Sequence, residues 1–220
     1  MFAPSLSKAR ARREKATALQ RVFCGAPSCG PLLQHELLLA LRDVSPQSYA
    51  RLVAETGLSL DKTEMVAERR QIVSAAAAMM LAHVIVREPE WVRIFDLAAE
   101  SLMAKLYFEL PFSLKFALNN LPRSMRVKLA FSTLAGRMYQ IGGSNCQLVS
   151  YKRHGNRAYI QIKEGMFADY LETRAGAREF YSAVLRSMFW HFARVECNVS
   201  EISSDQIMLH ECWFAAQWES

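Results

Sequence analysis

The sequence predicts an α+β fold, in which an N-terminal helical bundle packs with a four-stranded antiparallel sheet of ββαββ order. Apolar residues recur at helical spacing as far as Gly142-Gly143, and beyond that point they alternate with a period of two. The alternating runs form two pairs, with a helical stretch between the pairs. A chain of 220 residues, 51% hydrophobic and 22% charged, is long enough to bury a sizeable core. We therefore expect a basic arm or helix over residues 1–21 and a single domain over 22–220, helical in 22–141 and ββαββ in 142–220.

Six stretches of the first part have the apolar spacing of helices, and Pro or Gly bounds several of them. They are residues 32–44, which Ser45-Pro46 close, 47–56, which Gly57 closes, and 61–86, 88–110, 112–121 and 123–141. The second half of 61–86 is apolar all round, which is typical of a central core helix. The stretch 88–110 has one apolar stripe, formed by Trp91, Phe95, Leu102 and Leu106.

Two hairpins and one helix make up the predicted ββαββ unit. The first hairpin joins 145–151 to 157–163 through a turn at Gly155-Asn156. Its expected register sets Tyr151 opposite Ile160 and Val149 opposite Ile162, with Gln161 on the solvent face. The helix covers 176–196. The second hairpin joins 195–202 to 207–214 through a turn at Ser204-Asp205, which sets Val195 opposite Phe214, Cys197 opposite Cys212 and Val199 opposite His210.

The run His210-Glu211-Cys212 is either a reactive site or part of a strand. His210, Cys212 and the facing Cys197 are candidate metal ligands, because zinc prefers thiolate and imidazole. A closed zinc site needs four ligands at short local spacings, which the sequence lacks. A nucleophilic Cys212 would need a base, and His210 lies roughly 6–7 Å away along the strand. We interpret both cysteines as small hydrophobic residues of the core face.

No motif for a nucleotide, a metalloprotease site or a serine nucleophile is present in the sequence, so no catalytic residue is predicted. A lone histidine in an apolar helix is more often part of the core than a haem ligand, and aromatic clusters are usually core as well. Some of these side chains could nevertheless line a ligand pocket between helices and sheet. The candidates are His83, Phe95, Phe180, Val184, Trp190 and His191.

The net charge of +6 is distributed unevenly along the chain. Residues 1–21 carry six basic side chains and one acidic, and residues 110–163 carry nine basic and none acidic. Residues 164–220 carry nine acidic and four basic side chains. The acid-free stretch either offers a positive surface to nucleic acid or lipid head groups, or packs against the acidic C-terminal part of the same chain.

The remaining features of the sequence concern the cellular compartment of the protein. The N-terminus is charged where a signal peptide would be apolar, and no apolar run reaches the roughly 18 residues of a membrane span. Five cysteines without regular spacing are typical of reduced thiols. We therefore expect a bacterial-type cytoplasmic protein without a transmembrane segment.

The chain from Arg93 onwards resembles a family of uncharacterised bacterial proteins that is expanded in myxobacteria. The matching features are the small-residue helix around Ala98 to Ala104, "NNLPRSMR" before the sheet, "GMFADYLETRAGAREFYSAVL" after the first hairpin, and a last strand ending in "CWFAAQWE". Members of that family have a leading helical bundle and a C-terminal ββαββ unit, so the resemblance implies the same architecture here.

At the level of fold, the same order resembles three further groups: the 4-vinyl-reductase-type domains of phenol-responsive regulators, the haem nitric-oxide/oxygen-binding domains, and the TRAPP vesicle-tethering subunits. In those groups the interior between helices and sheet binds small organic molecules, haem or an acyl chain. The Y-x-S-x-R signature of the haem-binding group is missing here, and "YSAVLR" at Tyr181 to Arg186 is only superficially similar. The zinc-binding cysteine cluster of the phenol sensors is missing as well, so no ligand residue is transferred.

We therefore expect a non-enzymatic sensor or adaptor domain that holds a small apolar ligand between helices and sheet, without a cofactor. The alternatives are a protein–protein interaction module with a filled core and an enzyme with an unrecognised site. A sensor of this size signals most simply through a homodimer or another protein partner. The basic arm, with Lys8, Arg10, Arg12, Arg13, Lys15 and Arg21, could instead contact nucleic acid, which we do not favour.

Overall fold

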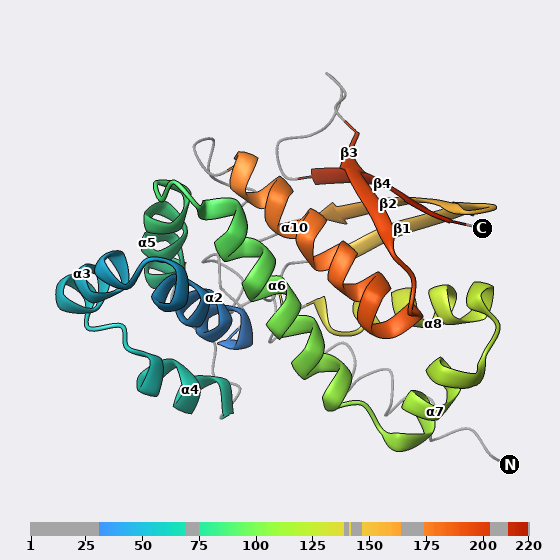
Figure 1. Ribbon diagram of the computed structural model, residues 1–220, viewed down its shortest axis with the longest axis horizontal. Helices are drawn as coiled ribbons and strands as arrows, with labels where there is room; N and C mark the ends of the chain where they lie inside the picture. The colour runs from blue at the N-terminus through green and yellow to red at the C-terminus, as the bar shows by residue number, and fades with distance from the viewer. Residues whose placement is uncertain are drawn as a thin grey trace, which may run out of the picture.

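The computed structural model describes residues 31–68, 75–138, 141, 147–163, 174–202 and 211–219 (Figure 1). The helices of the first part are α2 (Pro31–Val44), α3 (Pro46–Thr56), α4 (Leu60–Glu68), α5 (Ala75–Val86), α6 (Trp91–Phe108), α7 (Phe112–Asn120) and α8 (Arg123–Ala135). They are followed by β1 (Gln147–His154), β2 (Arg157–Lys163), α10 (Arg174–Met188), η2 (Phe189–Ala193), β3 (Cys197–Glu201) and β4 (Glu211–Trp218). This order confirms the predicted α+β class. The predicted arm 1–21 lies outside the described residues.

Helix α6 is the centre of the helical part, and it contacts α2 on one side and α10 on another. Its buried face follows the predicted stripe, because Phe95, Leu102 and Leu106 have no exposed surface. Alanines on the same face, Ala98 and Ala99, are also fully buried and let the neighbouring helices approach closely.

The predicted helix ends are confirmed where Gly and Pro mark them. Helix α2 ends before Ser45-Pro46, and α3 ends at Gly57. Gly57 has the left-handed φ of 67°, which costs glycine little, and its N–H donates to the carbonyl of Val53 at 2.8 Å.

The single long helix predicted over 61–86 is wrong, because the structure has two helices there, α4 and α5. Helix α4 packs against α2, whereas α5 contacts α2, α3 and α6. Among the described helices, only α2 is a close neighbour of both, and the run of apolar residues in the sequence does not reveal that the chain changes direction between them. Residues 69–74, between the two helices, lie outside the described residues.

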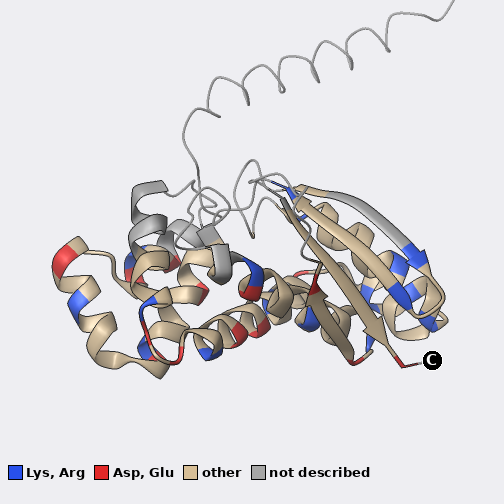
Figure 2. Cartoon of the chain, turned by 90° about the horizontal axis from the view of Figure 1, so that it is seen from above, with Lys and Arg blue, Asp and Glu red and all other residues tan. Residues whose placement is uncertain are grey.

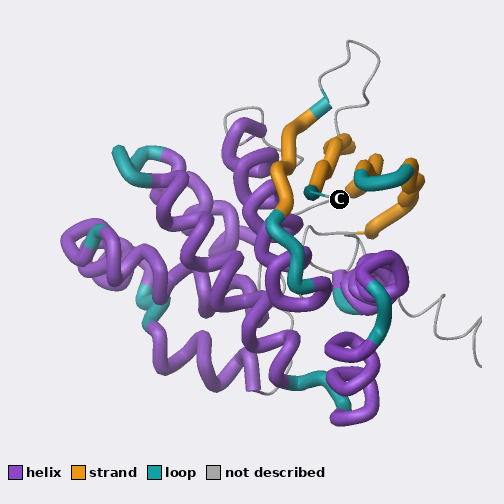
Figure 3. Tube along the Cα trace, turned by 45° about the vertical axis from the view of Figure 1, so that its right-hand side comes forward, coloured by secondary structure: helices purple, strands orange, loops and turns teal. Residues whose placement is uncertain are grey.

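The strands form one antiparallel sheet, as predicted, and their order in it is β1-β2-β4-β3. The sheet lies on one side of the molecule, and helices cover one of its faces (Figure 3). Helix α10 runs beside α6 and contacts β3 and β4, so it forms a middle layer between the helical part and the sheet (Figure 1). Every second residue of β4 from Cys212 to Trp218 is buried on the inner face.

The first hairpin has the predicted pairing at one end and a different pairing at the other. Tyr151 lies opposite Ile160, as expected. A β-bulge between Leu148 and Ser150 shifts the register, so Leu148 rather than Val149 lies opposite Ile162. The expected exposure of Gln161 is also wrong, because its side chain is buried.

The second hairpin has the predicted inner face but not the predicted register. Cys197 lies opposite Trp218 and Val199 opposite Ala216, so the pairing is displaced by six residues of β4 from the predicted one. Because six is even, the displacement leaves Val199, Cys212 and Phe214 on the buried face. Residues 202–210 separate the strands, and the predicted turn at Ser204-Asp205 lies outside the described residues.

Candidate functional site: a cleft beside a π-helical turn

The end of α10 departs from regular helix and creates the wall of a cleft. After Met188 the chain continues as the π-helical turn η2, and Arg194 then has a left-handed φ of 54°. The N–H groups of Arg194 and Val195 both donate to the carbonyl of Phe189, which closes the wide turn. Both π-helical turns and left-handed non-glycine residues are uncommon and occur frequently at functional sites.

The cleft lies between α6, the end of α10 and the start of β3, and its volume is about 250 Å³. Its lining combines an apolar surface with several polar groups. The lining residues are Glu100, Arg186, Ser187, Trp190, His191, Val195, Glu196 and Cys197.

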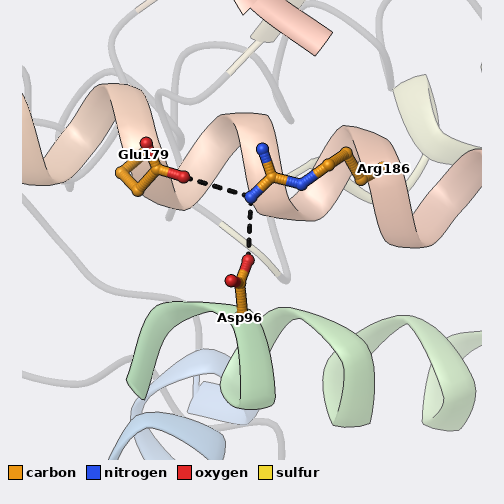
Figure 4. Close-up of polar contacts among 3 residues, drawn as sticks. All are labelled: Asp96, Glu179 and Arg186. Carbon is orange, nitrogen blue, oxygen red and sulfur yellow. Dashed lines mark hydrogen bonds and ion pairs between the residues drawn. The ribbon is translucent and has the colours of Figure 1, made fainter. Parts of the chain in front are cut away.

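Arg186 fixes one side of the cleft. Its Nη2 atom donates to Asp96 of α6 at 2.8 Å and to Glu179 of α10 at 3.1 Å (Figure 4). Burial disfavours the charge, but the hydrogen bonds that Arg186 donates to Asp96 and Glu179, together with their negative charges, outweigh burial and raise the pKa of the Arg186 guanidinium. Two carboxylates thus balance this cation, and its main effect is to hold α10 against α6.

Trp190 and His191 are the groups best placed to contact a ligand. The Trp190 side chain is 50% exposed, which is unusual for so large an apolar surface next to a cleft. The Nε2 atom of His191 is shielded from solvent and has no hydrogen-bond partner among the described residues. Burial lowers the pKa of His191, Glu100 opposes this effect, and Arg194 adds to it, so the imidazole is held in its neutral form.

Cys197 is a lining residue that could act as a nucleophile by its chemistry, with His191 in the same cleft. Burial raises the pKa of its thiol to about 12, although the backbone of Gln217 partly opposes the shift. Because the thiolate is the reactive species, a thiol with this pKa is a poor nucleophile at neutral pH. The arrangement suits hydrogen bonding and stacking better than covalent catalysis.

The structure separates the predicted pocket residues into two groups. Phe95, Phe180 and Val184 have no exposed surface and belong to the core between α6 and α10, whereas Trp190 and His191 line the cleft. The ring centroids of Phe95 and Phe180 lie 5.8 Å apart in an edge-to-face contact. His83 lies partly buried on α5 and does not line the cleft.

The predicted grouping of metal candidates is wrong for the two cysteines. Cys197 pairs with Trp218, and Cys212 pairs with Ile162 on the other side of β4. Six residues of strand, roughly 20 Å, separate Cys212 from the position opposite Cys197, so the two thiols cannot share one ion. His210 lies outside the described residues. Within the part of the chain that is described, no three His, Cys, Asp or Glu side chains gather to hold a metal ion.

The wall of the cleft that α10 and η2 form is indicated by helical spacing in the sequence. Arg186 and Trp190, like Ser187 and His191, are four residues apart, which places each pair on one side of a helix. We did not predict the opposite wall, because Glu100 comes from α6 and the chain of β3 approaches only through the tertiary fold.

Solved structures of H-NOX domains are similar to this chain in architecture. A mutant of the T. tengcongensis H-NOX domain has a TM-score of 0.58 and 9% identity, over 87% of this chain and 97% of that one. A structure that probes haem distortion in the H-NOX family has a TM-score of 0.56 and 10% identity, over 87% and 95%. The oxygen complex of an H-NOX domain related to soluble guanylate cyclases has a TM-score of 0.52 and 10% identity, over 84% and 92%. The chain shares their fold.

This likeness confirms the predicted resemblance to haem nitric-oxide/oxygen-binding domains at the level of fold. No protein-family model and no curated protein sequence matches the chain. The likeness to the myxobacterially expanded family therefore stays a prediction.

The cleft beside η2 does not fit the haem that one of these H-NOX structures concerns. Haem iron needs an axial side chain inside a pocket large enough for the macrocycle. The cleft, at about 250 Å³, is smaller than the roughly 300–1,000 Å³ of pockets for drug-sized ligands. Phe95 and Phe180 have no accessible surface, so not even a water-sized molecule touches them. His35, a buried histidine of α2, already has a partner, because its Nδ1 atom lies 3.2 Å from the Thr63 hydroxyl.

Proposed function

We propose that this chain is a non-enzymatic sensor or adaptor domain that binds a small organic molecule in the cleft beside η2. The observation that carries the proposal is the Nε2 atom of His191, which is buried without a partner next to the half-exposed ring of Trp190. A buried polar atom without a hydrogen bond is destabilising by about 1–3 kcal/mol. A ligand that reaches Nε2 after a rotation of the imidazole ring, and donates to it, would remove this penalty.

The cleft favours a particular kind of ligand. A neutral imidazole with a free nitrogen accepts a hydrogen bond, and the indole of Trp190 offers a flat apolar face. The ligand we expect is therefore compact and flat, with one hydroxyl or N–H group. The shared fold of H-NOX domains supports a sensor role, and the proposal places the ligand in this cleft rather than in a haem pocket.

Two measurements test this function. Native mass spectrometry of freshly purified protein should show a bound small molecule. Calorimetric titration should show that 2-naphthol, which can donate a hydrogen bond, binds more tightly than 2-methylnaphthalene, which cannot.

The substitutions Trp190→Ala and His191→Leu should each weaken 2-naphthol binding about tenfold, because each removes one of the two contacts. A matched control is the pair Tyr159→Ala and His154→Leu, because these side chains are an exposed aromatic residue and an exposed histidine that lie on the sheet, with ring centroids 6.3 Å apart. Absence of any bound molecule together with absence of probe binding would favour an interaction module with a filled core.

A further inference from the structure

The connection from α6 through α7 to α8 exposes an unusual set of large apolar side chains. Phe108 is 74% exposed, Phe112 82%, Phe116 59% and Met125 53%. Phe112 and Phe116 are four residues apart on one face of α7, and their ring centroids lie 6.4 Å apart. We call Phe108, Phe112, Phe116 and Met125 the phenylalanine surface. Exposed apolar side chains that gather in this way usually mark an interaction site.

The phenylalanine surface is a fixed feature of the fold. The ammonium group of Lys115 donates to the carbonyl of Phe108 at 2.6 Å and lies 5.8 Å from the centre of its ring. This contact ties the end of α6 to α7. Leu118 of α7 is fully buried and anchors the helix, so its Phe112 and Phe116 face outward.

Positive charge surrounds these rings. Lys115, Arg123 and Lys128 lie on α7 and α8, inside the stretch 110–163 that has no acidic side chain. Glu109, which follows α6, pairs with Arg137 at 2.9 Å, and Arg123 donates a hydrogen bond to the backbone carbonyl of Glu219. Lys and Arg gather at the end of the molecule that carries the C-terminus (Figure 2).

We propose that the phenylalanine surface binds the surface of a bilayer that contains anionic phospholipids. Aromatic rings that project beside lysine and arginine side chains insert at the boundary between head groups and acyl chains, while the cations attract anionic lipids. The inference is independent of the ligand cleft, which lies beside Glu100 near the middle of α6 and has none of these four side chains in its lining.

Charge and shape favour a bilayer over the other possible binding partners of the phenylalanine surface. A second copy of the chain would bring two basic surfaces together, and the basic arm 1–21, with six basic side chains and one acidic, would be repelled likewise. A protein partner needs pockets that match separate rings, whereas a fluid bilayer accepts rings that project from a convex turn. Helix α7 lies at the outer edge of the molecule, beyond the end of α6 (Figure 1). No helix in the described residues is long and apolar enough to cross a membrane, so the binding we infer is peripheral.

Vesicle sedimentation of the full chain tests this inference. The protein should bind phosphatidylcholine vesicles that contain phosphatidylserine, and bind pure phosphatidylcholine vesicles about tenfold more weakly or worse. The triple variant Phe108→Ser, Phe112→Ser and Phe116→Ser should lose about tenfold or more in affinity, with all charges unchanged. The matched control is Val92→Ser with Leu97→Ser, which removes apolar side chains that are each 39% exposed elsewhere on α6.

A second readout locates the contact. Hydrogen exchange on phosphatidylserine vesicles should slow in the peptide that covers α7 and not in α3. Equal vesicle binding by the triple variant and the unaltered chain would overturn the proposal, because it would assign binding to the arm alone. Absence of vesicle binding would overturn it too. Self-association that the triple variant abolishes would assign the surface to a second copy instead.

Discussion

The carboxylate of Glu36 on α2, whose side chain has no exposed surface, forms an ion pair with the ammonium group of Lys105 on α6 at 2.5 Å. No described group donates a well-aligned hydrogen bond to either oxygen of Glu36. The charge of Lys105 is therefore the main compensation for burying this carboxylate, and it joins the two helices at the centre of the bundle.

Removal of that charge should destabilise the protein. Lys105→Met should lower the free energy of unfolding in urea by about 1–3 kcal/mol, less than for a fully buried pair because the Lys105 side chain is 44% exposed. Lys128→Met on the exposed side of α8 is the control and should have almost no effect on stability. The double variant with Glu36→Gln should recover most of the loss, and a double variant as unstable as Lys105→Met would show that the ion pair is not the cause.

Gly176 lies where α10 packs closely against Val86 of α5 and Phe95 of α6. A Cβ atom there would lie 2.9 Å from Cγ2 of Val86 and 3.3 Å from Cε2 of Phe95. Gly176→Ala should therefore destabilise the protein by about 1–3 kcal/mol through overpacking. Gly136→Ala, whose Cβ would meet nothing nearer than 3.6 Å, should be neutral or stabilising by about 0.5 kcal/mol. Equal denaturation midpoints for the two variants would mean that the helices are not this close.

Cys197 should react slowly in the folded protein although it is only partly buried. With a pKa of about 12, its thiol should alkylate with iodoacetamide on the order of a thousandfold more slowly than an ordinary cysteine. A cysteine introduced by Ser200→Cys, at an exposed position of the same strand, is the control and should react at an ordinary rate. Peptide mass spectrometry separates the sites. Fast labelling of Cys197 in the native state would restore the case for a nucleophilic site.

The parts of the fold that the sequence predicts well depend on local signals. The stripe of α6 and the stop at Gly57 follow from helical periodicity and from backbone freedom at one residue. The inner face of β4 was predicted correctly although the register was not, because alternation is the same for every even displacement. The register depends on how many residues connect the two strands. We assumed a two-residue turn at Ser204-Asp205, whereas residues 202–210 separate β3 from β4.

The candidate site was predicted in part for a similar reason. Trp190 and His191 belong to an aromatic cluster near the end of a helix, which is a local signal. The contact of Arg186 with Asp96 joins residues 90 positions apart, and nothing in either helix alone indicates it. Phe95 and Phe180 are residue types that often line ligand pockets. Their side chains have no exposed surface because α6 and α10 pack closely against each other, and this packing is not visible in the sequence.

The pH dependence of stability provides a test of the environment of His191. An unfolded histidine titrates near pH 6.5, and burial lowers the pKa of His191 in the folded protein, with Glu100 opposing and Arg194 assisting. Between the two pKa values the unfolded chain binds a proton that the folded chain does not. The stabilisation from the neutral imidazole is therefore complete above about pH 6.5 and declines as the pH falls below it.

The substitution His191→Gln should remove this titration. Between about pH 7.5 and pH 5, the free energy of unfolding should fall more for the unaltered protein than for His191→Gln, as measured by urea titrations at each pH. The other charged groups of the cleft, Glu100, Arg186 and Glu196, stay the same in both proteins, so the difference isolates His191. His154→Gln, at an exposed position of β1, should leave the pH dependence as it is in the unaltered protein. A steeper acid loss in His191→Gln would mean that the imidazole is charged in the folded state, and the proposed acceptor role of Nε2 would then fail.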